Sequence, residues 1–109
     1  MKNGVYVISK GDLDNIVYIG ETTAKTGGLR KRMTNFYRAT QDGVSKHSGG
    51  RTYNKLFGTD VSDLTVRYHT ANSQMDNLEV LCAYIKLAER ALIWRFVEEH
   101  RRIPVCNYK

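Results

Sequence analysis

Glu89 occupies an unusual place for a charged residue. It lies four residues after Ile85 and four before Ile93, within a helical surface that is otherwise apolar. A carboxylate in such a surface is partly desolvated and needs a nearby cation. Two interpretations are open: an ion pair with Arg32 or Lys86, or a single divalent cation such as Mg²⁺, held by the carboxylate together with water and a bound phosphate.

A second candidate is a basic side chain at the edge of an apolar stripe. Arg32 lies three residues after Leu29 and four before Phe36, so it flanks the stripe instead of facing outward. Held there, its planar guanidinium could contact a phosphate through two hydrogen bonds. The alternative is an arginine that only covers apolar surface with its stem. Arg30 and Lys31 can point outward and would add positive charge.

His47 belongs to a predicted loop that reads Lys46-His47-Ser48-Gly49-Gly50, with Arg51 next. A loop histidine is commonly a plain surface residue. Between basic neighbours and beside glycines that leave the backbone accessible, it could instead contact phosphate or transfer a proton.

The elements that must position these residues begin with a β-hairpin. Two runs rich in β-branched and aromatic residues, 4–8 and 16–20, flank a loop that contains Gly, Asp and Asn. If the turn is centred near Asp12, Tyr6 lies directly opposite Tyr18 and the two phenols share one face of the sheet. Both tyrosines could also serve only as cross-strand packing residues.

Four further elements follow the hairpin. Apolar residues at helical spacing predict two helices, alternation predicts a strand, and capping-box patterns at 73–76 and 76–79 precede a long helix without Gly or Pro. The predicted spans are a helix over 29–39, a short helix over 52–57, a strand over 64–69 and a helix from the capping residues to about 100, with Pro104 ending regular structure. At about 1.5 Å per residue the last helix is long for a small domain, so we expect a bend or break in it.

The element order ββ-α-α-β-α predicts an α/β (α+β) fold in which a small three-stranded sheet packs against helices. The 109 residues suffice for a single domain, 1–109, with one modest core. No apolar stretch reaches membrane-spanning length and the chain leads directly into a strand, so we expect a cytoplasmic protein without a membrane segment or secretory signal. Cys82 and Cys106 form no close-spaced pair, which favours reduced thiols and no zinc site.

The charge balance indicates a class of partner. The chain carries 17 Lys and Arg against 11 Asp and Glu, a formal net charge of +6. A small basic domain is attracted to polyanions, of which nucleic acid is the commonest. Charge alone does not decide the matter, since many basic proteins bind no nucleic acid.

Taken together, the candidate residues resemble the motif series of the GIY-YIG nucleases over nearly the whole chain. The matching positions, in order, are Gly4-Val5-Tyr6, Tyr18-Ile19-Gly20, Arg32, His47, Glu89 and Asn107. The resemblance implies an antiparallel three-stranded sheet flanked by helices, and metal-dependent hydrolysis of a DNA phosphodiester. It is nearer to the homing and restriction endonuclease branches, which carry a histidine matching His47. The excision-repair branch tends to carry lysine where this chain has Glu21, a basic contact that Lys25 could supply.

The same resemblance implies a role for each matching residue. Tyr6 activates the attacking water with help from Tyr18. Arg32 holds the scissile phosphate, and Glu89 is the sole protein ligand of Mg²⁺ or Mn²⁺. A phenol with a reference pKa of about 10 is a poor base at neutral pH. Tyr6 therefore needs a nearby cation to lower its pKa, or it only orients the water.

The leading hypothesis is a divalent-metal-dependent DNA endonuclease, with His47 among its catalytic residues. The candidate DNA contacts are Arg30, Lys31, Lys46, Arg51 and Asn107. One active site cuts one strand, so a double-strand break needs a homodimer or two events, and specificity could come from a separate protein. The alternatives are a catalytically silent nucleic-acid-binding module of the same fold and a protein-interaction domain without salt-dependent DNA affinity.

Overall fold

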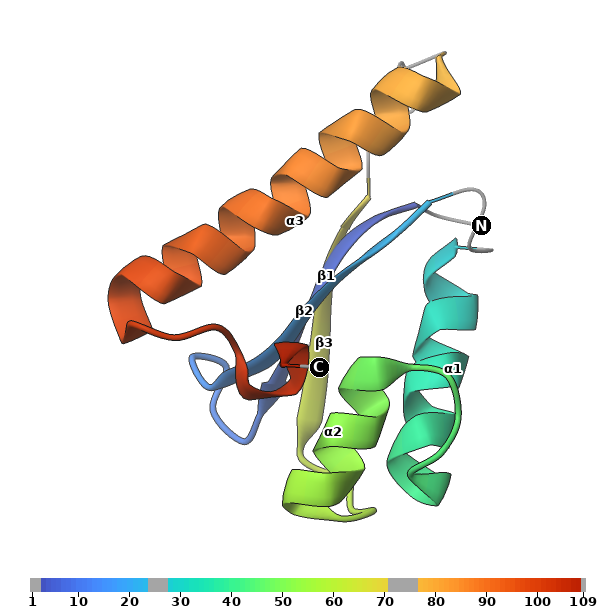
Figure 1. The fold of residues 1–109 in the computed structure, drawn as a ribbon, viewed down its shortest axis with the longest axis vertical. Coiled ribbons are helices and arrows are strands. Elements are labelled where there is room, and N and C mark those ends of the chain that lie inside the picture. Colours follow the sequence, from blue (N-terminus) through green and yellow to red (C-terminus); the bar gives the residue numbers. More distant parts are fainter. Residues whose placement is uncertain (1–2, 24–27, 71–76, 109) are drawn as a thin grey trace.

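The computed structural model describes residues 3–23, 28–70 and 77–108 and has the element order that the sequence predicts (Figure 1). The elements, with their bounds, are β1 (Gly4–Lys10), β2 (Ile16–Thr22), α1 (Gly28–Asp42), α2 (Ser48–Phe57), β3 (Leu64–Thr70), α3 (Leu78–His100) and a short 3₁₀ turn, η2 (Val105–Asn107). The expected α+β fold with a three-stranded antiparallel sheet is confirmed, and its strand order is β2-β1-β3.

The register of the hairpin differs from the expected one. Tyr6 pairs with Gly20 and Tyr18 pairs with Ile8, so the prediction that the two tyrosines lie directly opposite each other is wrong. A bulge between Ile8 and Ser9 and a wide loop shift the pairing away from a turn centred on Asp12. The phenols are diagonal neighbours on one face instead, with ring centroids 5.9 Å apart.

Glycine is required where the two phenols pass the backbone. A Cβ atom at Gly20 would lie 2.5 Å from the Tyr6 hydroxyl and 2.7 Å from the Tyr18 ring. On the other side of Tyr18, a Cβ atom at Gly49 would lie 2.4 Å from the same ring. The Tyr18 ring therefore fills a slot between two residues that lack side chains, and this slot fixes α2 against the hairpin.

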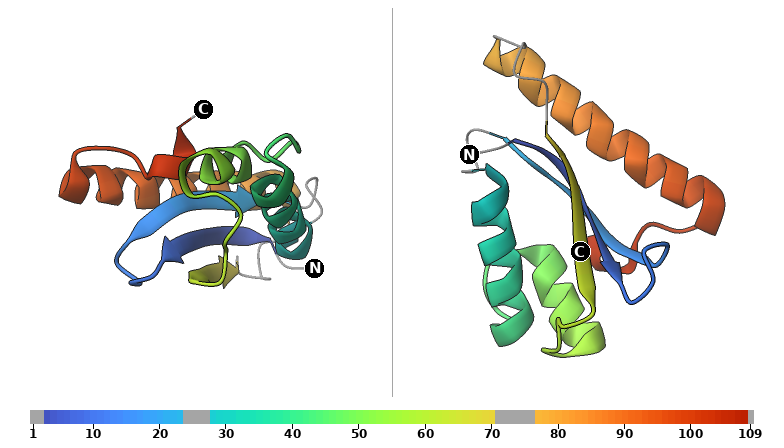
Figure 2. Two further views of the ribbon diagram at one scale, coloured as in Figure 1. Left: turned by 90° about the horizontal axis from the view of Figure 1, so that it is seen from below. Right: turned by 180° about the vertical axis from the view of Figure 1, so that it is seen from behind.

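Helices cover both faces of the sheet, as Figures 1 and 2 show. α1 and α2 lie over the face that carries Tyr6, Ile8 and Tyr18, where they build the main core. α3 crosses the opposite face, which carries Val5 and Ile19. Because β2 is an edge strand, residues from both helical layers can lie beside its free edge.

The long helix α3 is one continuous element, so the expected bend or break is wrong. It begins after the N-cap residue Asn77, whose side chain accepts from the backbone of Glu79 and Val80. Its 23 residues run past the end of the sheet (Figure 1), and this overhang lets it stay straight within a molecule 41 Å long. The first capping pattern, 73–76, lies outside the described residues.

Three other boundaries differ from the expectation. α1 begins at Gly28 and continues to Asp42, a turn beyond the expected end. α2 begins at Ser48 because His47 caps it, so His47 is the last residue of the predicted loop, and it is buried instead of lying on the surface. Regular structure also resumes after Pro104, where η2 forms.

Among the described residues, none of the helices combines the length and apolar character that crossing a bilayer requires. Both cysteines are free thiols, with Cys106 buried in the core and Cys82 partly buried on α3.

Replacing Gly20 with alanine should displace both phenols, because its new methyl group would overlap Tyr6 and Tyr18. We expect a loss of about 1–3 kcal/mol in the free energy of unfolding, the usual cost of overpacking a core. Chemical denaturation measures this loss. The control is Gly11→Asn, since Gly11 has φ of 72° and open space around it, a setting that asparagine accepts. Equal stability of Gly20→Ala and the wild type would contradict the steric slot.

Candidate active site

The candidate residues meet at a pocket of about 670 Å³ beside the free edge of β2. Its lining combines residues from both helical layers, the edge strand and the C-terminal segment. The lining residues are Tyr18, Ile19, Arg32, Ser48, Glu89, Arg90, Ile93, Trp94, Val97, Ile103 and Asn107. Four of the predicted site residues are thus brought together, namely Tyr18, Arg32, Glu89 and Asn107. Tyr6 and His47 lie directly behind Tyr18, within the core.

Arg32 reaches the pocket from α1 with part of its hydrogen-bonding capacity unused. Its Nε atom is buried and has no hydrogen-bond partner. Glu89 lines the same pocket from α3, yet none of the ion pairs found in the described segments joins it to Arg32 or Lys86. A close ion pair is thus not formed, although the positive charges of Arg90, Arg32 and Lys86 partly oppose the rise in the pKa of Glu89. The Nε–H donor of Arg32 remains available for another acceptor.

His47 links the helix α2 to the buried phenol of Tyr6. Its Nδ1 accepts a hydrogen bond from the backbone N–H of Gly50 at 3.1 Å, and its Nε2 lies 3.3 Å from the Tyr6 hydroxyl. Because Nδ1 is the acceptor, the proton of the neutral ring is on Nε2, which donates to Tyr6. In this tautomer His47 supports negative charge on the phenol and does not remove its proton.

The core around His47 disfavours its charged form. Burial and the nearby Arg32 guanidinium lower the pKa of His47 to about 4, with a smaller contribution from Arg51. The ring is therefore neutral at pH 7, which agrees with its role as both a cap acceptor and a single donor.

Both tyrosines also hold their protons tightly. Burial, followed by the proximity of Tyr18, raises the pKa of Tyr6 well above its ordinary value, although Arg32 opposes this shift. Burial likewise raises the pKa of Tyr18, again opposed chiefly by Arg32. Tyr6 is fully enclosed whereas Tyr18 lines the pocket, so Tyr18 is the phenol that can touch a bound molecule.

Glu21 is a site residue that sequence reasoning missed. Burial, followed by the negative charge of Glu21, raises the pKa of Glu89, so the two carboxylates lie near each other. One carboxylate oxygen of Glu21, Oε2, is buried without a hydrogen-bond partner. The available signal was strand parity: Glu21 follows Ile19 on the face that α3 covers, and it pairs with Val5.

Two adjacent carboxylates, one with a buried and unpartnered oxygen, suit a divalent cation of the hard, oxygen-binding kind. A closed cage is not part of the site, since the described residues include no group of three or more His, Cys, Asp or Glu side chains able to hold a metal. Water and a ligand oxygen would have to complete the coordination, as they commonly do for Mg²⁺.

Asn107 serves the fold through both atoms of its amide. Its Oδ1 accepts from the Ile19 N–H at 2.9 Å and its Nδ2 donates to the Ile19 carbonyl at 2.8 Å. The side chain thus satisfies the open edge of β2 and holds η2 beside the pocket. Asn107 is also one of the predicted DNA contacts, and both polar atoms of its amide are hydrogen-bonded to Ile19 in this structure.

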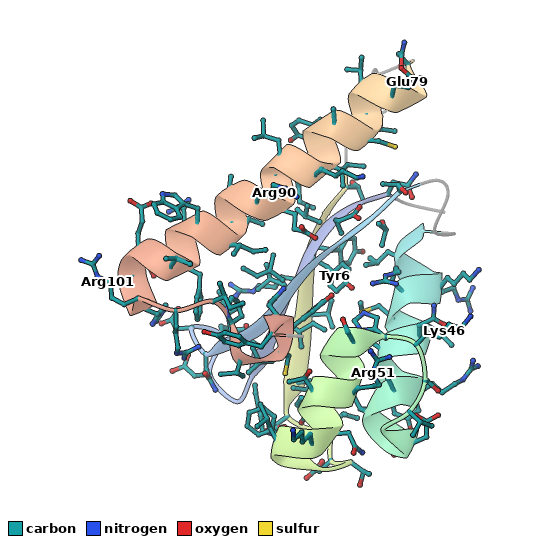
Figure 3. The ribbon with its side chains drawn as sticks, viewed as in Figure 1. Tyr6, Lys46, Arg51, Glu79, Arg90 and Arg101 are labelled. Carbon is teal, nitrogen blue, oxygen red and sulfur yellow. The ribbon has the colours of Figure 1, made fainter. Side chains whose placement is uncertain are left out.

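The other candidate DNA contacts lie outside the pocket. Arg30, Lys31, Lys46 and Arg51 are all exposed on the α1–α2 side of the molecule. Figure 3 labels Lys46 and Arg51, together with Arg90 on α3. Arg51 is partly engaged, because its Nη1 donates to the carbonyl of Ser45 at 2.8 Å. Lys25 lies outside the described residues.

Comparisons with protein-family models, with curated proteins and with solved structures found no match. The resemblance to the GIY-YIG nucleases therefore depends on the residues of this chain and on their geometry.

Stability should depend on pH through His47. Its pKa is about 4 in the folded protein and about 6.5 in an unfolded chain, so the unfolded state binds more protons between these values. The free energy of unfolding should therefore fall by as much as about 3 kcal/mol as the pH drops from 6.5 to 4. Denaturation at several pH values measures this slope.

The control is His47→Asn, because asparagine is a good N-cap residue that does not titrate. Its slope over the same pH range should be smaller than that of the wild type. Identical slopes would exclude His47 as the group responsible.

Proposed function

We propose that this protein is a divalent-metal-dependent endonuclease of the GIY-YIG type that hydrolyses DNA phosphodiester bonds. The observation that carries the proposal is the pocket beside β2, which an unpaired Arg32 donor and the Glu89 carboxylate enter from opposite helical layers. A phosphodiester has an anionic oxygen that can accept from Arg32. Its hydrolysis also needs a cation, which Glu89 would hold, to neutralise the charge that develops on phosphorus.

Arg32 would hold the scissile phosphate. Its buried Nε and a terminal nitrogen form the fork that matches two phosphate oxygens. This contact strengthens as negative charge accumulates in the transition state, and partial burial of the guanidinium makes it stronger than it would be in water.

Glu89 and Glu21 would hold Mg²⁺ or Mn²⁺ between them, with Glu89 facing the pocket. When bound, such an ion polarises the phosphoryl group and stabilises the leaving oxygen. Glu21 adds a second negative charge beside the ligand that the family resemblance implies, and a cation would satisfy its unpartnered oxygen.

The phenols would orient water instead of acting as free bases. Tyr18 lines the pocket and can accept or donate a hydrogen bond to water there. Tyr6, which accepts from His47, holds Tyr18 in place from behind. Both pKa values are raised, which supports the orienting role over proton abstraction in the protein alone.

The exposed basic residues of α1 and α2 would attract the DNA backbone without reading its sequence. A double-strand break would still require a homodimer, a second event or a separate protein that brings specificity. We place this activity in the cytoplasm.

Purified protein with Mg²⁺ should nick plasmid DNA, and EDTA should abolish the nicking. Glu89→Ala and Arg32→Ala should each lower the rate by roughly 10²–10³-fold, the usual effect of removing one stabilising contact to a developing charge. Tyr18→Phe should lower it more than Tyr6→Phe, because only Tyr18 lines the pocket. Agarose gels of nicked and linear plasmid measure these rates.

The matched control is Glu98→Ala, an exposed carboxylate on the same helix, which should retain wild-type activity. DNA binding without cleavage under all conditions would indicate the silent nucleic-acid-binding module. Full activity of Glu89→Ala would contradict the metal site.

Divalent cations should stabilise the protein even without DNA, since a ligand that binds only the folded state raises the free energy of unfolding. We expect Mg²⁺ or Mn²⁺ to raise the unfolding temperature of the wild type. The increase should shrink in Glu21→Gln and disappear in Glu89→Gln, while Glu98→Gln should retain it. Differential scanning fluorimetry measures the shift, and an undiminished shift in both site variants would contradict the carboxylate pair.

A further inference from the structure

The pocket beside β2 has two chemically different halves. One half is polar and holds the residues to which we assign the phosphate and the cation. The other half is apolar and comes mainly from α3, with Ile93, Trp94, Val97 and Ile103 as its lining residues. A nucleotide has the same two-part character, since an anionic phosphate lies close to a flat, largely apolar base.

Trp94 is the most conspicuous part of the apolar half. It is the single tryptophan of the chain and 61% of its surface is exposed. None of the aromatic pairs in the described part of the chain includes it, so its ring faces are not taken up by another ring. A tryptophan ring usually contributes its large apolar area to a core or an interface. Trp94 therefore has a surface that suits an external ring.

A positive charge lies beside this ring. Arg90 is exposed one helical turn before Trp94 and lines the same pocket, so both side chains belong to one side of α3. Aromatic rings interleaved with basic residues are the features that bind single-stranded nucleic acid, through base stacking and backbone attraction. Charge complementarity thus favours a nucleic acid over an apolar protein segment as the occupant.

We propose that Trp94 stacks on an unpaired base next to the phosphate held by Arg32, so that the preferred substrate is DNA with unpaired nucleotides, such as a flap, a bulge or a single strand. Within a continuous duplex both faces of each base are covered by neighbouring bases, and only an unstacked base has a free face. This inference rests on the proposed function for the phosphate site, and it names the class of DNA that the site takes.

The emission of Trp94 provides a direct test, because no other tryptophan contributes. Full-length protein is titrated in EDTA, which prevents cleavage, with a single-stranded oligonucleotide, a flapped duplex and a blunt duplex of equal length. We expect the first two to quench the tryptophan emission and the blunt duplex to leave it nearly unchanged. Emission that is insensitive to saturating unpaired DNA would overturn the proposal.

Substitution gives a second measurement. Trp94→Ala should weaken binding to the flapped duplex roughly 5- to 150-fold, the effect of losing one stacked base, and should leave binding to the blunt duplex unchanged. Trp94→Phe, which retains a ring, should bind the flapped duplex with an affinity between those of the wild type and Trp94→Ala. The matched control is Leu87→Ala, which removes an apolar side chain that is 67% exposed on the same helix but not part of the pocket. Fluorescence anisotropy of labelled DNA measures the affinities.

The possible outcomes separate this inference from the nuclease itself. Quenching by unpaired DNA without any cleavage in Mg²⁺ would support the base site and contradict the nuclease. Cleavage with equal losses on both DNA forms in Trp94→Ala would contradict the base site and leave the nuclease in place. Emission that changes with protein concentration alone, and not with DNA, would assign Trp94 to contact with a second copy and overturn the proposal.

Discussion

The arrangement of the candidate site depends on the slot that holds the Tyr18 ring. Gly20 bounds the slot from the sheet and Gly49 from the first turn of α2, and a single methyl group at either position would overlap the ring. The same turn of α2 begins with His47, so closing the slot also brings the imidazole to the Tyr6 hydroxyl. The lack of a side chain at Gly20 and Gly49 thus sets the distances among three candidate site residues, Tyr6, Tyr18 and His47.

The free edge of β2 explains why residues from opposite faces of the sheet line one pocket. Arg32 belongs to the layer on the tyrosine face, and Glu89 belongs to the layer on the other face. A central strand would separate them completely, whereas an edge strand lets both reach round to one pocket. An open edge would also expose unpaired backbone groups, and the amide of Asn107 satisfies those of Ile19 without filling the pocket.

Local patterns sufficed to predict the helices and strands. The hairpin register and the surroundings of the candidate site residues depend on contacts between segments distant in sequence. Alternation and helical spacing identified the three strands and the helices because these signals arise from each segment alone. The hairpin register depends on a bulge at Ile8 and Ser9 that no turn signal marks. His47 is buried because α2 packs against the hairpin, a contact made 41 residues from Tyr6. Glu21 is a candidate site residue only because α3 brings Glu89 close to it, and Glu89 lies more than 60 residues later in the chain.

The unpaired buried groups at and beside the pocket are the strongest physical sign of a function beyond stability. A buried polar atom without a partner costs about 1–3 kcal/mol, and the described residues include one such atom on Arg32 and one on Glu21. Their charges are opposite, yet none of the ion pairs in the described segments joins them: Arg32 comes from the helical layer on the tyrosine face, and Glu21 lies on the face under α3. A phosphate would supply the negative charge that complements Arg32, and a divalent cation would supply the positive charge that complements Glu21. The proposed substrate together with its metal ion would therefore satisfy both groups at once, which a single anion or a single cation could not do.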